Sequence, residues 1–411
     1  MDGYINVKKL TVTIAAGLLC AGVAVADEGR LALINANLFN GVEDRIAHNV
    51  TVLIADGRIE SIQSGSNAVP GGYDVIDCDG NYLMPGLIDV HTHLDNRAAA
   101  ARALASGTTT VRTASVPSFQ DVALRELVKN GSLPGPDVVA AGVYVTPDLD
   151  ESILADPRLA VLNSGVTTDE ELRLVVRVNA DRGADVIKTR GTERAGRPDT
   201  DPREQVYTER QLAVVVDEAR RHGLSVMVHA HGDEGARAAV LAGARSIEHG
   251  TYLSEPTLAL MKERGTWLVP TYVTMDEMNE EQYDHVLRLR GKHMVPKLEE
   301  VIRNAHRMGV RIATGADNYY DNESVNRISV EVAELVRLGL SHFEALQAAT
   351  VSSAELLELG DSTGRIAPGF EADVILLPDD PLEEIRAVQD VLLVISNGQV
   401  ALKRIPFALP E

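Results

Sequence analysis

The sequence predicts an α/β protein in which a central (β/α)8 barrel carries a small β-sandwich built from both ends of the chain. Three observations lead to this prediction. Eight apolar strand candidates follow one another in the centre, helical periodicity lies between most of them, and short strand-like runs occupy both chain ends. Glycine stands near the end of several of the central helices. Eight successive β/α units favour a closed TIM barrel over an open sheet.

The chain begins with a segment that we do not expect in the fold. Lys8 and Lys9 precede an apolar run over residues 10–25, which closes on a small-x-small sequence at Ala26. This order is typical of a secretory signal peptide. The run of about 16 residues is short of the ~20 that span a bilayer. We therefore expect a signal peptide over 1–26, export to the periplasm or the medium, and no stable membrane anchor after cleavage.

The domain limits follow from where strand-like runs give way to β/α units. Residues 27–84 form the first part of the predicted sandwich, and residues 85–362 form the barrel. Residues 363–411 complete the sandwich, with strands on both sides of the turn at 397–398.

The elements of the barrel alternate along the chain. The strand candidates lie at residues 87–93, 108–113, 137–143, 185–190, 224–230, 245–249, 266–271 and 310–315. Helical periodicity occupies residues 168–182, 208–222, 234–243, 254–264, 295–308 and 325–338, and a last helix pair covers about 341–360. The long segment 271–291, after the seventh strand, is predicted to be a lid or an extra helix.

Composition restricts the class of partner. The net charge is −21, with 45% hydrophobic and 24% charged residues, and the basic residues are not clustered. Because phosphate binding needs concentrated Lys and Arg, nucleic acid is excluded as a partner. Cleavage of the signal peptide leaves Cys78 as the single cysteine, so no intramolecular disulfide is expected.

Two histidines end the first barrel strand. His91 and His93 follow the apolar run 87–90, and side chains two apart on a strand point to the same side. Two neutral imidazoles at one point are typical of a metal site. The alternative is a polar strand end with two unrelated histidines.

Four further polar residues end other strands of the barrel. Lys188 ends the fourth strand, His229 the fifth and His249 the sixth, and Asp317 follows the eighth. The carboxyl ends of the strands meet on the face where such barrels carry their chemistry. Four histidines and an aspartate are enough ligands for two divalent ions, of which zinc is the expected one.

Lys188 needs a separate explanation, because a cation should not face metal ions. Burial lowers the pKa of a lysine, and the neutral amine can add carbon dioxide to form a carbamate, an anion able to bridge two metals. A shared water then loses a proton, and the resulting metal-bridging hydroxide attacks a polarised carbonyl. Asp317 takes up that proton and passes it to the leaving amine.

This pattern resembles the binuclear metal-dependent amidohydrolase superfamily, and flanking motifs agree over roughly residues 30–405. The matching runs include Met84-Pro85-Gly86-Leu87-Ile88-Asp89, Ile247-Glu248-His249-Gly250 and Gly364-Arg365-Ile366-Ala367-Pro368-Gly369. The closest branch holds Xaa-Pro dipeptidases and imidazolonepropionase-like proteins. Since imidazolonepropionase itself uses one metal and lacks the bridging lysine, Lys188 favours the peptidase-like side.

Two departures from the branch concern substrate choice. Residues 94–106 form a shorter link after the paired histidines than relatives have, which predicts a more open mouth of the site. The run 142–147 after the third strand lacks the Gly-Gly-His of many relatives.

Five residues near the predicted site are candidates for substrate contact. His231 is predicted to contact substrate or to support a ligand; Arg190 or Arg194 would bind a substrate carboxylate. The alternative for the arginines is a loop ion pair. Tyr144 and Tyr252 could hydrogen-bond a substrate, or simply pack at the rim.

The sequence therefore predicts a hydrolase of an amide bond in Xaa-Yaa dipeptides or N-acyl amino acids. The alternative substrates are cyclic amides, lactams or non-peptide aromatic amides, including mycotoxin-type amides. A non-catalytic scaffold on the same fold is the remaining alternative. Assembly into a homo-oligomer is possible through the barrel sides.

Overall fold

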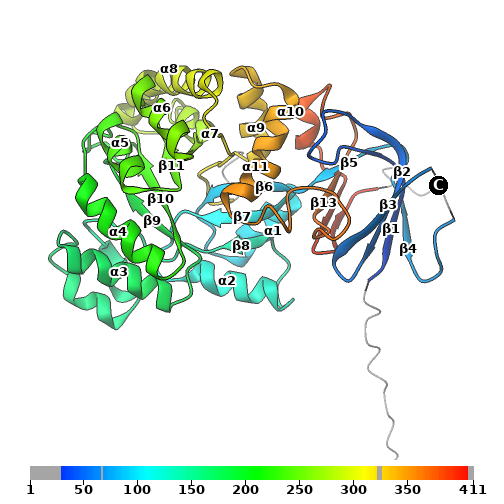
Figure 1. Cartoon of the computed structure of the whole chain (residues 1–411), viewed down its shortest axis with the longest axis horizontal. Coiled ribbons are helices and arrows are strands. Elements are labelled where there is room, and N and C mark those ends of the chain that lie inside the picture. Colours follow the sequence, from blue (N-terminus) through cyan, green and yellow to red (C-terminus); the bar gives the residue numbers. More distant parts are fainter. Residues whose placement is uncertain (1–28, 66–67, 322–325, 406–411) are drawn as a thin grey trace, which may run out of the picture.

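The computed structural model describes residues 29–65, 68–321 and 326–405, so the predicted signal peptide lies outside the described residues. Figure 1 shows two parts: strands gathered at one end of the molecule and a larger part rich in helices. Within the described ranges, no helix is long and apolar enough to cross a membrane.

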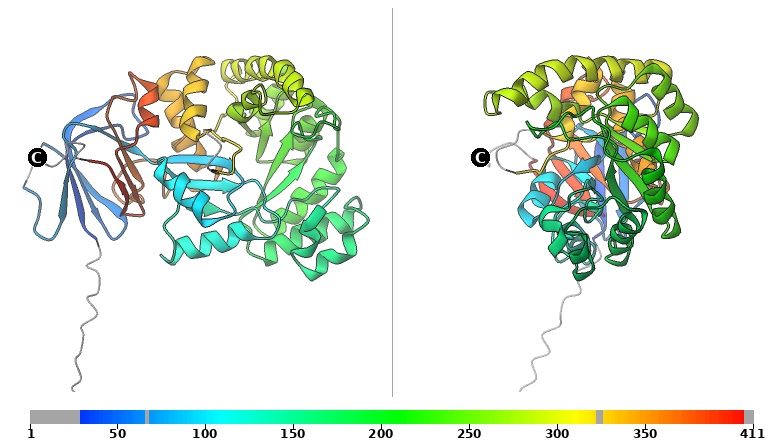
Figure 2. Two further views of the ribbon diagram at one scale, coloured as in Figure 1. Left: turned by 180° about the vertical axis from the view of Figure 1, so that it is seen from behind. Right: turned by 90° about the vertical axis from the view of Figure 1, so that its left-hand side faces the viewer.

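Both chain ends contribute to one eight-stranded sheet. Its strands are β1 (Leu31–Leu38), β2 (Ala47–Ala55), β3 (Arg58–Ser64), β4 (Asp74–Asp77), β5 (Tyr82–Pro85), β13 (Val374–Leu377), β14 (Leu393–Ser396) and β15 (Gln399–Lys403). The antiparallel pairing of β5 with β13 joins the two ends, and β1 pairs with β4 and β5 on one edge and β2 on the other. From behind, Figure 2 shows the late strands beside the early ones. The sheet encloses its own apolar core, with Leu33, Ile54 and Ile395 fully buried.

The larger part contains two parallel sheets. One consists of β6 (Leu87–Thr92), β7 (Thr108–Thr113) and β8 (Asp137–Val139). The other consists of β9 (Val186–Arg190), β10 (Ser225–Ala230), β11 (Ser246–His249) and β12 (Trp267–Val269). Isolated parallel bridges lie between the sheets: Val145 pairs with Thr189, Leu268 with Ile312, and Thr92 with Asn318.

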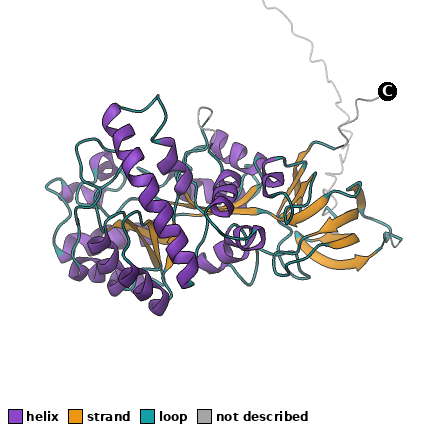
Figure 3. Cartoon of the chain, turned by 90° about the horizontal axis from the view of Figure 1, so that it is seen from above, coloured by secondary structure: helices purple, strands orange, loops and turns teal. Residues whose placement is uncertain are grey.

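Eleven helices are present in the described ranges, most of them between successive strands. They are α1 (Arg97–Ala105), α2 (Gln120–Lys129), α3 (Asp169–Asp181), α4 (Glu209–Arg221), α5 (Asp233–Ala242), α6 (Glu255–Arg264), α7 (Tyr272–Glu277), α8 (His285–Met308), α9 (Ile328–Arg337), α10 (His342–Ala348) and α11 (Val351–Leu356). The 3-10 helices are η1 (Asp150–Leu154), η2 (Pro157–Leu162) and η3 (Ile385–Gln389). Figure 3 shows the helices around the strands of the larger part, and few helices at the other end. Capping boxes at Thr168, Thr208 and Ser341 fix where α3, α4 and α10 begin.

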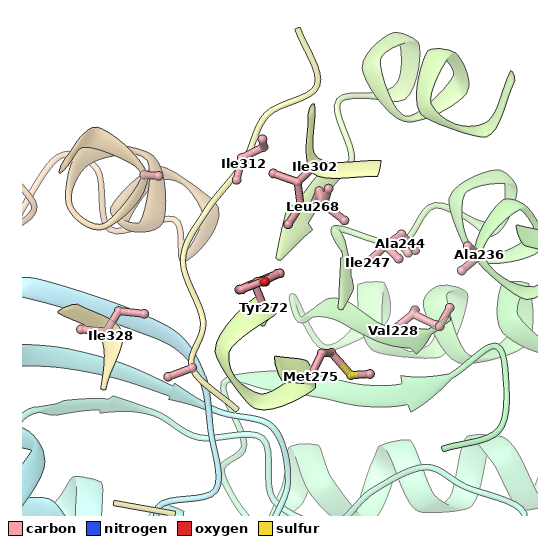
Figure 4. Close-up of a cluster of buried hydrophobic side chains, with 14 of the residues drawn as sticks. Val228, Ala236, Ala244, Ile247, Leu268, Tyr272, Met275, Ile302, Ile312 and Ile328 are labelled. Carbon is pink, nitrogen blue, oxygen red and sulfur yellow. The ribbon is translucent and has the colours of Figure 1, made fainter. Parts of the chain in front are cut away.

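The main core lies between the strands and the helices that cover them. Figure 4 shows Val228 of β10, Ile247 of β11 and Leu268 of β12 with Ala236 of α5 and Ile302 of α8 in one apolar cluster. All five are buried. Because these side chains come from strands and helices far apart in sequence, their packing holds the strand ends in a fixed relation.

Two of the strand predictions were wrong: one strand is shorter than predicted, and one predicted segment forms no strand. The strand predicted over 137–143 stops at Val139, because the carboxylate of Asp121 takes the N–H groups of Ala141 and Gly142. The segment 310–315 forms no strand and pairs only through Ile312. Its backbone hydrogen bonds alternate between β12 and β6: the Ala313 N–H donates to the carbonyl of Leu268, and the Thr314 carbonyl accepts from the N–H of Val90.

The helices also differ from the prediction in two places. Residues 97–105, expected as part of a short link, form α1, which begins where the side chain of Asn96 accepts from the N–H of Ala99. The segment 271–291 contains α7 and the first turns of α8, which continues through Pro296. That segment is therefore an extra helix plus an early start of α8.

A buried carboxylate at the junction with the end sheet predicts how stability depends on pH. Burial, with Asp137 nearby, raises the pKa of Asp373 to about 7. The folded protein therefore binds more protons than the unfolded chain between about pH 4 and pH 7. The contribution of Asp373 to the free energy of unfolding therefore falls as the pH rises. Compared with Asp373→Asn, the wild type should lose on the order of 1 kcal/mol of unfolding free energy per pH unit from pH 5 to 7.

Thermal or urea unfolding of both proteins at several pH values measures this difference. The comparison cancels the contribution of other titrating groups, including the buried histidines. Parallel curves for the two proteins would show that Asp373 is ionised in the folded state across the whole range.

Candidate active site

All six predicted metal ligands line one cavity of about 640 Å³. They are His91, His93, Lys188, His229, His249 and Asp317. His91, Lys188, His229 and His249 lie on β6, β9, β10 and β11, and Asp317 lies in the irregular segment that follows Ile312. The parallel strands thus bring these side chains to one place, as the sequence predicted, although β9 continues for two residues beyond Lys188.

The two histidines of the first strand converge on the aspartate. His91 Nε2 lies 3.4 Å and His93 Nε2 3.1 Å from Asp317 Oδ1. The other ring nitrogen of each histidine already has an acceptor: Glu248 Oε2 at 2.6 Å from His91 Nδ1, and the carbonyl oxygen of Ser115 at 3.0 Å from His93 Nδ1. Because carboxylates and carbonyls only accept, each Nδ1 carries the proton and each Nε2 presents a lone pair.

Lone pairs on both Nε2 atoms therefore face a carboxylate oxygen. Acceptors that converge in this way need a shared cation between them. A divalent metal ion, whose preferred ligands include imidazole nitrogen and carboxylate oxygen, fits this arrangement.

The remaining histidines extend the cluster. The ring of His249 lies 5.1 Å from that of His91, 4.5 Å from that of His229 and 4.7 Å from that of His231. Two groups have their ligand atoms within 4.8 Å of one another: His91, His249 and Asp317, and His229, His231 and His249. Burial lowers the pKa of all four histidine rings, which keeps them neutral and able to bind a metal.

Hydrogen bonds fix which nitrogen each of these rings presents. His249 Nδ1 lies 2.7 Å from Thr271 Oγ1, whose own hydroxyl hydrogen goes to the carbonyl of Pro270, so His249 donates and Nε2 is left with its lone pair. His229 Nε2 lies 3.1 Å from the carbonyl oxygen of Glu193, which leaves Nδ1 of His229 as the free nitrogen. Partners of this kind orient metal-binding histidines in proteins.

Lys188 is buried in the cavity wall without a partner. Its Nζ makes no hydrogen bond among the described residues, and it lies 5.8 Å from the centre of the Tyr144 ring. Burial lowers the pKa of the Lys188 amine to about 8. The wall therefore holds an amine for which the chain supplies no counter-ion in hydrogen-bond contact.

Four residues at or beside the cavity have a left-handed backbone conformation. His249, Asp317, Ser115 and Thr271 are non-glycine residues with φ of 73°, 48°, 94° and 49°. Such left-handed conformations are sparsely populated and persist where the surroundings determine them, often at functional sites.

Glu248 is a supporting residue to which the sequence reasoning gave no role. It is fully buried on β11, accepts from His91 Nδ1 and also accepts from Arg112 Nη2 at 3.0 Å and from Ser246 Oγ at 2.5 Å. Burial would raise its pKa, but Arg112 and His91 lower it to about 2. The carboxylate thus fixes the tautomer and direction of His91. An acidic residue inside a predicted barrel strand, directly before a predicted ligand, was the signal that could have identified it.

The predicted substrate contacts divide into two sets. Tyr144, Arg194 and His231 line the cavity, and His231 Nδ1 is 2.9 Å from Thr251 Oγ1. Arg190 does not line it; its Nη1 pairs with Glu193 Oε2 at 3.0 Å, which corresponds to the loop ion pair given as the alternative. Tyr252 does not line the cavity and lies in a separate recess between α6 and α8.

The cavity wall also contains segments for which the sequence gave no prediction. Apolar side chains come from α7 and the turn after it, including Met275 and Met278, and from Tyr319 after Asp317. The His93 and Tyr319 rings stack with 5.0 Å between their centres. The mouth is formed in part by η1 and the residues before it.

Gly315 allows His91 to approach the backbone, which gives a test of the site's packing. A Cβ atom on residue 315 would lie 2.6 Å from His91 Cβ and 2.7 Å from Val269 Cγ1, closer than such atoms pack. Gly315→Ala should therefore displace His91, lower metal affinity and destabilise the fold by about 1–3 kcal/mol. Metal titration and thermal unfolding measure both effects.

Gly71→Ala is the matched control, since nothing lies within 4 Å of a Cβ there and its φ is not in the left-handed region. Unchanged metal affinity in Gly315→Ala would contradict the placement of His91.

The chain is similar to several known proteins. The model of the amidohydrolase family matches residues 82–401. The ochratoxinase of Aspergillus niger is 27% identical over 421 residues, covering 90% of this chain and 85% of the relative. A solved Xaa-Pro dipeptidase with methionine bound in its active site has a TM-score of 0.82 and 26% identity, covering 90% of this chain and 99% of that one. A putative prolidase from Bifidobacterium longum has a TM-score of 0.79 and 28% identity, covering 91% and 94%.

These comparisons confirm the resemblance predicted from the strand-end residues. The family match spans most of the chain, including both parallel sheets and the segment that carries Asp317. The chain belongs to the amidohydrolase family.

Proposed function

We propose that the protein is a binuclear metal-dependent hydrolase that cleaves an amide bond in dipeptides or N-acyl amino acids. One observation carries the proposal: lone pairs on His91 and His93 converge with the Asp317 carboxylate on one point, beside three more neutral histidines. A divalent ion shared by the three side chains would satisfy that arrangement.

The chain's own donors divide into two sets for two ions. His91, His93 and Asp317 form the first set, and His229 and His249 form the second. Lys188, carboxylated by carbon dioxide, would lie between them as the shared anionic ligand, which explains an amine that has no partner. When bound, the ions supply Lewis acidity for the amide carbonyl and for water, and zinc is the expected metal.

The side chains around the donors have separate tasks in this reaction. Asp317, which lines the cavity, takes up a proton from the attacking water and returns it to the leaving amine. Glu248 holds His91 in its tautomer, and Thr271 does the same for His249. The apolar wall with Met275 and Met278 excludes water from the reacting bond.

The comparisons support an amide substrate and favour a second candidate. The similar Xaa-Pro dipeptidase and putative prolidase support a dipeptide or N-acyl amino acid. The similarity to an ochratoxinase favours non-peptide aromatic amides of the mycotoxin type as the second candidate.

We infer further that the two parallel sheets close into an eight-stranded barrel through the segment 310–318. Two backbone bonds support this: Val90 N–H donates to Thr314, and Val145 N–H donates to Lys188. The irregular segment would then take the place of the eighth strand.

Metal analysis and a substrate panel test the proposal. We expect about two divalent ions per chain and release of amine from some Xaa-Yaa dipeptides or N-acyl amino acids. Activity on aromatic non-peptide amides alone would select the second candidate. A purified protein that retains no metal after supplementation would instead be a non-catalytic scaffold.

A further inference from the structure

We propose that Tyr144, Thr146 and Arg194 form an anion subsite in the cavity wall that binds a free carboxylate on the substrate. The inference rests on the proposed amide hydrolysis and narrows its substrate class to amides that carry a carboxylate.

The three side chains share an unusual feature. Tyr144 Oη, Thr146 Oγ1 and Arg194 Nε are all buried, and none has a hydrogen-bond partner among the described residues. All three residues line the same cavity as the predicted metal ligands. Because buried polar atoms without partners are rare and costly in native proteins, a group of three in one wall indicates a missing ligand.

The backbone explains why two of the donors point into the cavity together. Tyr144 and Thr146 flank Val145, which pairs with Thr189 of β9, and both line the cavity. Val145 between them bonds to β9 through its own backbone: its N–H donates to Lys188, and its carbonyl accepts from Thr189 Oγ1 at 2.9 Å. The strand pairing therefore fixes the direction of both hydroxyls.

Arg194 is placed near these hydroxyls by a fixed loop. Arg194 lines the same cavity wall as Tyr144 and Thr146. Arg290 of α8 holds the loop by donating to the carbonyls of Ala195 at 2.5 Å and Arg197 at 2.6 Å. A loop fixed in this way presents Arg194 without further ordering.

Neighbouring arginines are neutralised and Arg194 is not. Arg190 pairs with Glu193 at 3.0 Å, and Arg197 pairs with Asp150 at 3.8 Å. Arg194 makes no ion pair within the described ranges. The guanidinium only donates, and a carboxylate only accepts, so a substrate carboxylate would satisfy Arg194 and accept from both hydroxyls. A neutral group would leave the Arg194 guanidinium without a counter-ion.

Two compounds that differ only in the carboxylate provide the test. N-acetyl-L-phenylalanine and N-acetylphenethylamine contain the same scissile amide and the same ring, and the apolar cavity wall accommodates both. We expect the wild type to have about 10- to 100-fold higher kcat/KM for the acid, the range of a charged hydrogen bond. Arg194→Ala should remove that preference, mainly by raising the KM for the acid.

Thr146→Val and Arg197→Ala complete the design. Thr146→Val keeps the side-chain shape and removes one donor, so it should weaken the preference for the acid several-fold. Arg197→Ala removes a cation from the same loop that already has a partner, so the preference should stay at the wild-type value. An Arg194→Ala enzyme that still prefers the acid as strongly as the wild type overturns the subsite.

The outcomes also separate the subsite from the proposed function. If the metal-loaded wild type hydrolyses both compounds equally well, amide hydrolysis stands and the subsite is wrong. If it hydrolyses neither, calorimetric titration of the two compounds into wild type and Arg194→Ala decides. Tighter binding of the acid that depends on Arg194 retains the subsite while the proposed reaction fails, and equal binding rejects the subsite.

Discussion

Replacing Lys188 by alanine is expected to abolish amide hydrolysis and to reduce the bound metal to less than two ions per chain. The Lys188 amine is buried in the wall and has no hydrogen-bond partner within the part of the chain that the structure describes. As a carboxylated lysine it would supply the shared anionic ligand, and without it the histidines would hold the ions individually. The loss of several kcal/mol of transition-state stabilisation corresponds to a decrease of about 10³-fold in kcat.

Elemental analysis and amine-release assays measure both effects. Lys297→Ala is the matched control, because that amine is exposed on α8 and pairs with Glu300 at 3.5 Å. The carbamate itself is tested by reloading metal-free wild type in buffer depleted of carbon dioxide, where recovery should be slow until bicarbonate is added. Full activity of Lys188→Ala would falsify the bridging role.

The positions of the metal-binding candidates could be predicted from sequence because they follow from local rules. The two-residue period of a strand places His91 and His93 on one side, and parallel strands bring Lys188, His229 and His249 to one edge. Neither rule depends on side-chain packing. The structure accordingly brings all of these residues into one cavity.

The hydrogen bonds through which Glu248 and Arg112 hold His91 could not be predicted, because they depend on the register between strands far apart in sequence. Arg112 of β7 contacts Glu248 of β11, although 136 residues separate them. Whether a buried charge on one strand faces a charge on another depends on strand order and stagger. The motif around His249 contained Glu248, but local periodicity gave no partner for it.

The irregular parts of the fold escaped prediction for a related reason. The run 310–315 is apolar enough to predict a strand, yet its backbone bonds alternate between two neighbours, and the Asp89 carboxylate takes the N–H of Ala316. Side-chain acceptors that replace ladder bonds are tertiary features. The cavity mouth at η1 is likewise set by packing of short turns rather than by a period.

Asp317→Asn is expected to lower kcat by about 10²- to 10⁴-fold, the range of a lost general acid–base group, with a smaller change in KM. Asparagine keeps the shape of the side chain but cannot take up a proton. It also turns one acceptor into a donor, which would face the lone pairs of His91 and His93 in place of the anion.

Metal content of Asp317→Asn separates the two roles that this residue is expected to have. A variant that keeps both ions and loses kcat shows proton transfer as the main role, whereas loss of one ion shows that the carboxylate is needed as a ligand. Asp379→Asn removes an exposed carboxylate outside the cavity and should match the wild type in both measurements. The Asp317 oxygen lies where both histidines converge, and no other carboxylate among the described residues occupies that point, so no neighbour could take over its role. Wild-type kcat with full metal content in Asp317→Asn would therefore remove Asp317 from the mechanism.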